Sequence, residues 1–180
     1  MTDPMLVGDV VLHDDEYTAH VTLLLGSAGG SFQTAFSTVA TSHRAGFIPF
    51  IVCAQPRVPV WPRTIFVNKN PYDNDAHGEL FWGPAHLGVA QGLQEGVERG
   101  LLTEAQAKDH LCIAAAWVWE TATDRDRICR QNSQATLQAL EQAMTGAPGL
   151  AAVREAVATE GYHNLFHRIE PEPAAARGIT

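Results

Sequence analysis

Alternating apolar and polar positions dominate the beginning of the chain. Residues 6–12 read LVGDVVL and residues 17–25 read YTAHVTLLL, with the polar stretch HDDE at 13–16 between them. Successive side chains of a strand lie on opposite faces of a sheet, so every second residue from Tyr17 to Leu25 lies on one apolar face, and His20 and Thr22 lie on the other. The pattern predicts a β-hairpin with His20 on its more polar side.

The rest of the chain alternates between helical periodicity and short apolar runs typical of strands. Interleaved strands and helices predict a mixed α/β (α+β) domain, with a sheet covered mainly by helices on one face. We expect one domain over residues 1–148 and a helical extension with a tail over 149–180. Beyond the hairpin, the predicted strands are 47–54, 64–69 and 111–120. The first two predicted helices are 32–41, capped by Ser31, and 83–100, with Pro84 in its first position. Three more follow: one from Thr103 with Gln106 as its capping-box partner, one from the capping pair Thr123 and Asp126 to Met144, and one within 150–166.

Composition narrows the classes of function. The net charge of −8 argues against binding to a nucleic-acid backbone, and no window approaches the ~20 apolar residues of a membrane span. No basic segment precedes an apolar run at the N-terminus, so we expect a cytoplasmic protein without membrane partners. The three cysteines are far apart in sequence, which favours reduced thiols over disulfides or a CxxC site.

Several short motifs resemble binding sites but do not require a functional role. GSAGGS at 26–31 lacks the spacing of a phosphate-binding loop, and a flexible turn is favoured. DNDAHG at 73–78 begins like a calcium loop, but Pro84 stands where the bidentate glutamate is required. His163 and His167 are spaced to share a metal on a helix, yet no third ligand is evident, so we expect no metal site. His20, Lys69 and His86 remain as candidates that spacing alone cannot join.

Six ordered blocks resemble the formaldehyde-activating enzyme family: AHVTLLLG, GSAGGSFQTAF, AGFIPFIV, FVNKN, FWGPAHLGVAQGL and WVWETATDRDRICRQNSQATLQAL. The resemblance covers roughly residues 6–146. It implies a fold of the ribosomal protein S5 domain 2-like kind and a homopentamer with sites between neighbouring subunits. It also implies that formaldehyde condenses with tetrahydromethanopterin, a co-substrate, to give the methylene adduct and water, with no metal and no tightly bound cofactor.

The same resemblance assigns roles to residues. His20 matches the proposed general acid, and Lys69 matches the lysine that helps to hold the pterin. Histidine suits this step because its ordinary pKa lies near neutrality, and an acid that protonates the carbinolamine oxygen turns a poor leaving group into water. Lys69 could instead form a Schiff base with formaldehyde if it were desolvated, but a charge that holds the cofactor tail is favoured.

The remaining substrate-binding positions depart from the family pattern. Thr22 stands where the family has aspartate, Pro71 where it has threonine, and His86 where it has glutamine, while Ile51 keeps an apolar position. We expect the dipole at a helix start to keep His86 neutral. These departures leave two alternatives open beside the parent reaction: formaldehyde condensation with a different amine acceptor, and a non-catalytic homologue that binds a pterin or an aldehyde adduct.

Overall fold

The computed structural model describes residues 5–161, and the chain forms two compact units, Met1–Ala147 and Pro148–Thr180. Within the described residues of the first unit, five strands form one mixed sheet in the order β1-β2-β7-β6-β3, with β6 parallel to β7 and the other neighbours antiparallel. The predicted mixed α/β class is confirmed. The strands are β1 (Leu6–Leu12), β2 (Ala19–Ser27), β3 (Phe50–Ile51), β6 (Arg63–Asn68) and β7 (His110–Trp117).

The predicted hairpin is formed by β1 and β2, which pair in a register that places Asp9 opposite Thr22. β2 begins two residues later than expected, because Tyr17 is part of the turn: its amide donates to the Asp14 carbonyl at 2.8 Å. The Tyr17 ring is buried, and its hydroxyl lies 3.3 Å from Thr123 Oγ1. The alternation predicted for β2 is confirmed, since Ala19, Val21, Leu23 and Leu25 are all fully buried.

The helix expected at 83–100 begins earlier, so the prediction that Pro84 opens it is wrong. Asn74 caps the helical run by accepting a hydrogen bond from the His77 amide, and α2 (Asp75–Leu80) continues into a π-helical turn (Phe81–Ala85) and α3 (His86–Glu98). Pro84 lies inside the π-helical turn. A single π-helical turn alters the backbone hydrogen-bond pattern at the point where proline lacks its N–H, so the helix passes through the proline.

Two other helix starts also differ from expectation. Asp124, not the pair Thr123 and Asp126, caps α5 (Arg125–Thr145), because its carboxylate accepts from the Arg127 amide at 2.9 Å. Gly30 occupies the cap position of α1 (Ser31–Thr41) without a side-chain bond, so Ser31 does not act as the cap.

Other expected helix boundaries are confirmed. Thr103 and Gln106 form both halves of the capping box of α4 (Glu104–Asp109). Gly146 ends α5 in the left-handed region with φ +68°, a conformation that glycine adopts without strain. The boundary predicted near Met144 is therefore correct to within a residue.

The apolar run predicted as one strand at 47–54 is divided. β3 joins the main sheet, whereas β4 (Cys53–Gln55) pairs with β5 (Val58–Pro59) in a separate two-stranded sheet. Val52 lies between the two strands and is fully buried.

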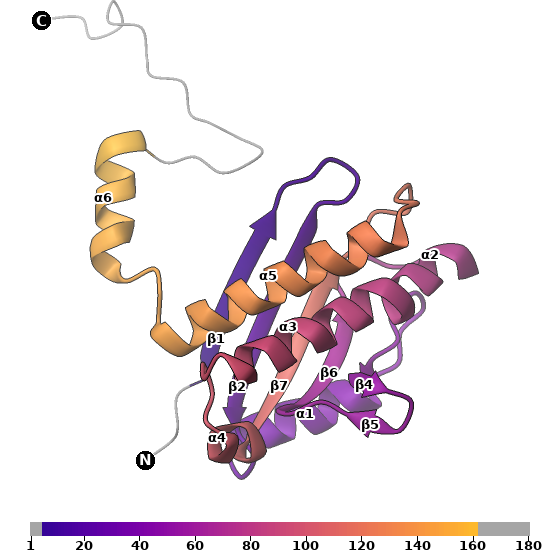
Figure 1. Cartoon of the computed structure of the whole chain (residues 1–180), viewed down its shortest axis with the longest axis horizontal. Helices are drawn as coiled ribbons and strands as arrows, with labels where there is room; N and C mark the ends of the chain where they lie inside the picture. Colours follow the sequence, from indigo (N-terminus) through magenta and orange to yellow (C-terminus); the bar gives the residue numbers. More distant parts are fainter. Residues whose placement is uncertain (1–4, 162–180) are drawn as a thin grey trace, which may run out of the picture. The chain divides into compact units, whose positions relative to one another are not determined.

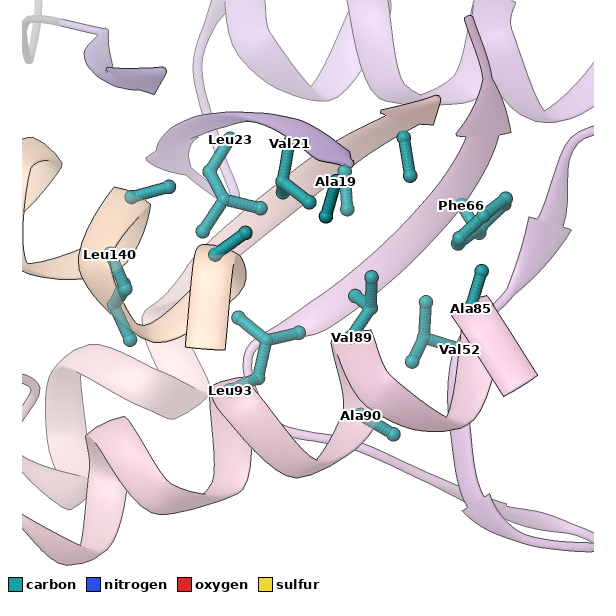
Figure 2. Close-up of a cluster of buried hydrophobic side chains, with 14 of the residues drawn as sticks. Ala19, Val21, Leu23, Val52, Phe66, Ala85, Val89, Ala90, Leu93 and Leu140 are labelled. Atoms are coloured by element: carbon teal, nitrogen blue, oxygen red, sulfur yellow. The ribbon is translucent and has the colours of Figure 1, made fainter. Parts of the chain in front are cut away.

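The core lies between the sheet and helices α3 and α5, which cover the same face, while α1 lies on the other (Figure 1). Figure 2 shows side chains from β2 and β6 pointing toward α3 and α5. Close approach of the two helices depends on small residues. A Cβ added at Gly92 of α3 would lie 2.5 Å from the Ser133 carbonyl oxygen of α5. Helices α3 and α5 cover one face, as predicted, and the other face is open around Asp9 and His20, whose side chains are 52% and 35% exposed.

The second unit contains α6 (Leu150–Glu160). The candidate metal pair His163 and His167 lies outside the described residues. Among the described helices, none combines the length and the apolar character that crossing a membrane requires.

Candidate functional site

Four polar side chains meet on the open face of the sheet: Asp9, His20, Thr22 and Lys69. The hairpin register places Asp9 directly opposite Thr22, and His20 is two residues along the same face of β2. Lys69 follows β6, and its amide donates to the Ala116 carbonyl of β7 at 2.8 Å. The two strands of the hairpin and the residue that follows β6, which is distant from them in sequence, therefore form one cluster.

The Asp9 carboxylate is the centre of this cluster. His20 Nε2 lies 3.0 Å from Oδ1 and 3.1 Å from Oδ2 of Asp9. The Thr22 hydroxyl donates to Asp9 Oδ1, and Lys69 Nζ lies 3.5 Å from the same oxygen. Since a carboxylate is an acceptor, the proton of this contact is on Nε2, which leaves Nδ1 of His20 for a substrate.

The pKa values of Asp9 and Lys69 both lie below their ordinary values. Burial of the Asp9 carboxylate raises its pKa, but the hydrogen bonds from Thr22 and His20 and the charge of Lys69 outweigh this effect, so the pKa of Asp9 lies below its ordinary value. Burial lowers the pKa of the Lys69 amine, and Asp9 offsets this only in part. Asp9 therefore stays a carboxylate at neutral pH.

Access to the cluster is uneven. The side chain of His20 is 35% exposed and that of Asp9 52%, whereas that of Lys69 is only 17% exposed. Trp117 pairs with His20 across β2 and β7, and its ring packs edge-on against Trp119 with 5.6 Å between the ring centres. A flat ring beside an accessible imidazole can support a planar heterocycle.

Ile51 and His86 lie in another part of the fold. Ile51 is on the edge strand β3 and is exposed, and His86 begins α3. His86 Nε2 accepts the Cys53 amide proton at 2.9 Å, and its ring packs edge-on against Phe50. Within the described residues, no recorded hydrogen bond, ion pair or ring contact joins Ile51 or His86 to Asp9, His20 or Lys69.

The neutral form of His86 has a different cause from the one expected. Burial lowers the pKa of His86, although a hydrogen bond from the ring to the Trp82 carbonyl opposes this shift. The helical run begins at Asp75, so His86 does not occupy its first turn. With one ring nitrogen donating and the other accepting, His86 is held by the protein itself.

The family resemblance named His20, Thr22 and Lys69 together with Ile51 and His86, and the structure brings only the first three together, around Asp9, which sequence reasoning missed. The aspartate expected by family resemblance is replaced by Thr22, yet a carboxylate is still present because Asp9 supplies one from the neighbouring strand. The three cysteines, Cys53, Cys112 and Cys129, are free thiols, as predicted.

Comparisons with known proteins bear on this arrangement. The family model described as "Formaldehyde-activating enzyme (Fae)" matches residues 7–166. The chain is 32% identical over 159 residues to a 5,6,7,8-tetrahydromethanopterin hydro-lyase from Methanosarcina barkeri, with 88% of each chain covered. It is also 32% identical over 149 residues to a bifunctional enzyme Fae/Hps from Methanococcoides burtonii. These aligned residues make up 83% of this chain and 38% of that longer protein.

Proposed function

The chain belongs to the formaldehyde-activating enzyme family, and from this membership we propose that it condenses formaldehyde with tetrahydromethanopterin to give the methylene adduct and water. This activity makes it a hydro-lyase whose co-substrate is the reduced pterin. The observation that carries the proposal to particular residues is the contact of His20 with the Asp9 carboxylate on an accessible face of the sheet.

We assign His20 as the general acid. A pterin nitrogen adds to formaldehyde to give a carbinolamine, whose hydroxyl is a poor leaving group. Protonation by His20 lets that oxygen leave as water, and the iminium ion that remains is attacked by the second nitrogen. The proton released when the methylene bridge closes returns to His20, so the acid is regenerated.

Asp9 positions this acid. The carboxylate accepts the hydrogen bond from Nε2 of His20, which fixes the ring and leaves Nδ1 for the substrate. Lys69, which contacts the same carboxylate, is our candidate for holding the pterin. The Thr22 hydroxyl donates a further hydrogen bond to the Asp9 carboxylate and so restricts its rotation.

We propose the homopentamer and the ribosomal protein S5 domain 2-like fold on the same family basis. Exposed apolar side chains on the sheet support an assembly: Val7 is 47% exposed, Val11 42% and Ile51 41%. Contact between copies of the chain would bury such residues. It would also allow the exposed Ile51 of one subunit to lie beside the cluster of another. The cytoplasmic location stays a prediction.

A different amine acceptor is the second candidate, and the state of His86 favours it. Both ring nitrogens of His86 are engaged within the protein, so this position has no free hydrogen-bonding group for a pterin. A change of acceptor would leave the chemistry of His20 intact. A non-catalytic homologue would bind pterin or aldehyde without turnover.

The test is stopped-flow formation of the methylene adduct from formaldehyde and tetrahydromethanopterin, compared with the spontaneous rate. We expect acceleration by the wild type and a loss of about 10²- to 10⁴-fold in His20→Ala, with pterin binding retained. His43→Ala is the matched control, because His43 is an exposed histidine in the loop after α1. Equal rates for wild type and His20→Ala would refute the assignment. Wild-type acceleration seen only with another amine would select the second candidate.

A further inference from the structure

A second polar cluster lies outside the proposed site, where the start of α2 meets the loop that follows β7. One ligand atom from each of Asp73, His77 and Glu120 lies within 4.8 Å of the others. Asp73 immediately precedes the helix cap, His77 is in the first turn of α2, and Glu120 belongs to the loop after β7. Both carboxylates are exposed, whereas His77 is only 3% exposed.

The hydrogen bonds of His77 leave one of its ring nitrogens unused. His77 Nε2 lies 3.0 Å from the Val118 carbonyl oxygen, which can only accept a proton. The neutral ring therefore carries its proton on Nε2 and presents a lone pair on Nδ1. Nδ1 is buried and has no hydrogen-bond partner in the part of the chain that the structure describes. A buried acceptor without a partner requires an explanation.

The bond from Nε2 to Val118 is the arrangement that a metal-binding histidine uses. Such residues donate their second ring N–H to a carbonyl or carboxylate, which fixes the tautomer and orients the free nitrogen toward the metal. Two carboxylates and a neutral imidazole together carry the charge that balances a divalent cation. We propose that Asp73, His77 and Glu120 bind one divalent transition-metal ion such as Zn²⁺, with His77 coordinating through Nδ1.

The geometry requires only small movements. Ligand atoms about 2.0–2.2 Å from a tetrahedral Zn²⁺ lie about 3.4 Å apart, so atoms that now lie within 4.8 Å of one another need to approach by at most about 1.4 Å. The two exposed carboxylates can supply this by rotation of their side chains. An imidazole ligand selects against Ca²⁺ and Mg²⁺, which prefer oxygen ligands throughout. Three protein ligands leave a fourth position for water.

Binding would join two segments near the proposed site. Glu120 lies in the loop after Trp117, the residue that pairs with His20. The side chain of Asn70 already holds this loop by donating to the Val118 carbonyl at 2.9 Å. A metal that joins Glu120 to α2 would brace the same loop, so we expect Zn²⁺ to raise the melting temperature.

The experiment is calorimetric titration of Zn²⁺ into the full chain after removal of metals with EDTA. We expect one Zn²⁺ per chain, and at least tenfold weaker binding in Glu120→Gln and in Asp73→Asn, both exposed positions at which the fold should persist. Glu79→Gln is the matched control, because Glu79 is an exposed carboxylate of the same helix. His163→Gln with His167→Gln removes the other candidate pair, and we expect unchanged binding.

Long-range ¹H–¹⁵N spectra supply a readout specific to His77. We expect the Nε2-protonated tautomer before the titration and a shift of the Nδ1 resonance on adding Zn²⁺. Three results would overturn the proposal: absence of one-to-one binding, Zn²⁺ binding that disappears only in the His163 and His167 variant, or His77 resonances that do not move. A preference for Ca²⁺ over Zn²⁺ would overturn the assigned metal class.

Discussion

Replacement of Asp9 by asparagine tests whether this carboxylate supports the proposed acid. The substitution keeps the size of the side chain and removes the charge that contacts His20 at 3.0 Å. A hydrogen bond to a charged group contributes about 1.5–3 kcal/mol. Because Asp9 and His20 are 52% and 35% exposed, water screens the interaction, and the lower end applies. About 1.5–2 kcal/mol corresponds to a fall in kcat of about 10- to 30-fold.

The assay is the stopped-flow measurement of methylene-adduct formation, with a denaturation curve for each variant as the check on folding. We expect the fall in kcat in Asp9→Asn while the denaturation midpoint of the variant stays close to that of the wild type. Asp15→Asn removes the same charge from the exposed turn of the hairpin and should leave kcat unchanged. An Asp9→Asn enzyme with wild-type kcat would show that the carboxylate does not support the acid.

Three further predictions concern stability and thiol reactivity. Burial lowers the pKa of His86 in the folded state, so the free energy of unfolding should fall as pH drops below the ordinary histidine value of about 6.5. Urea titrations at two pH values should show a smaller fall in this free energy for His86→Gln than for the wild type. Gly92→Ala should destabilise the protein by about 1–3 kcal/mol, because its Cβ would lie 2.5 Å from a carbonyl oxygen of α5, whereas Gly29→Ala, with open space around its Cβ, should not; equal denaturation midpoints would contradict this. Cys112 is fully buried and its pKa is raised to about 12, so it should resist a thiol reagent in the native protein while the two partly exposed cysteines react. Equal reaction rates for all three cysteines would argue against the burial of Cys112.

Much of the fold follows from local patterns in the sequence. Alternation located the hairpin, and the capping box at Thr103 and the glycine at 146 located helix ends, because each depends on a few neighbouring residues. The predictions failed where a distant contact or an unusual backbone decides. Pro84 is a favourable first helical residue, yet it lies within a helical run because a π-helical turn accommodates it. The run at 47–54 divides because β3 and β4 have different partners.

The residues of the candidate site also differ in this respect: some are placed by neighbouring sequence, and Lys69 is placed by a strand pairing that is distant in sequence. In an antiparallel hairpin, a slip of one residue would turn every side chain to the other face, so the buried positions of both strands fix which residues share the open face. Val10 and Val21 are both buried, which places Asp9 and His20 together on the opposite face in any register that keeps this core. Asp9 was therefore accessible to sequence reasoning. Lys69 was not, because its approach depends on the parallel pairing of β6 with β7, and no local pattern specifies which strand becomes the neighbour of β6.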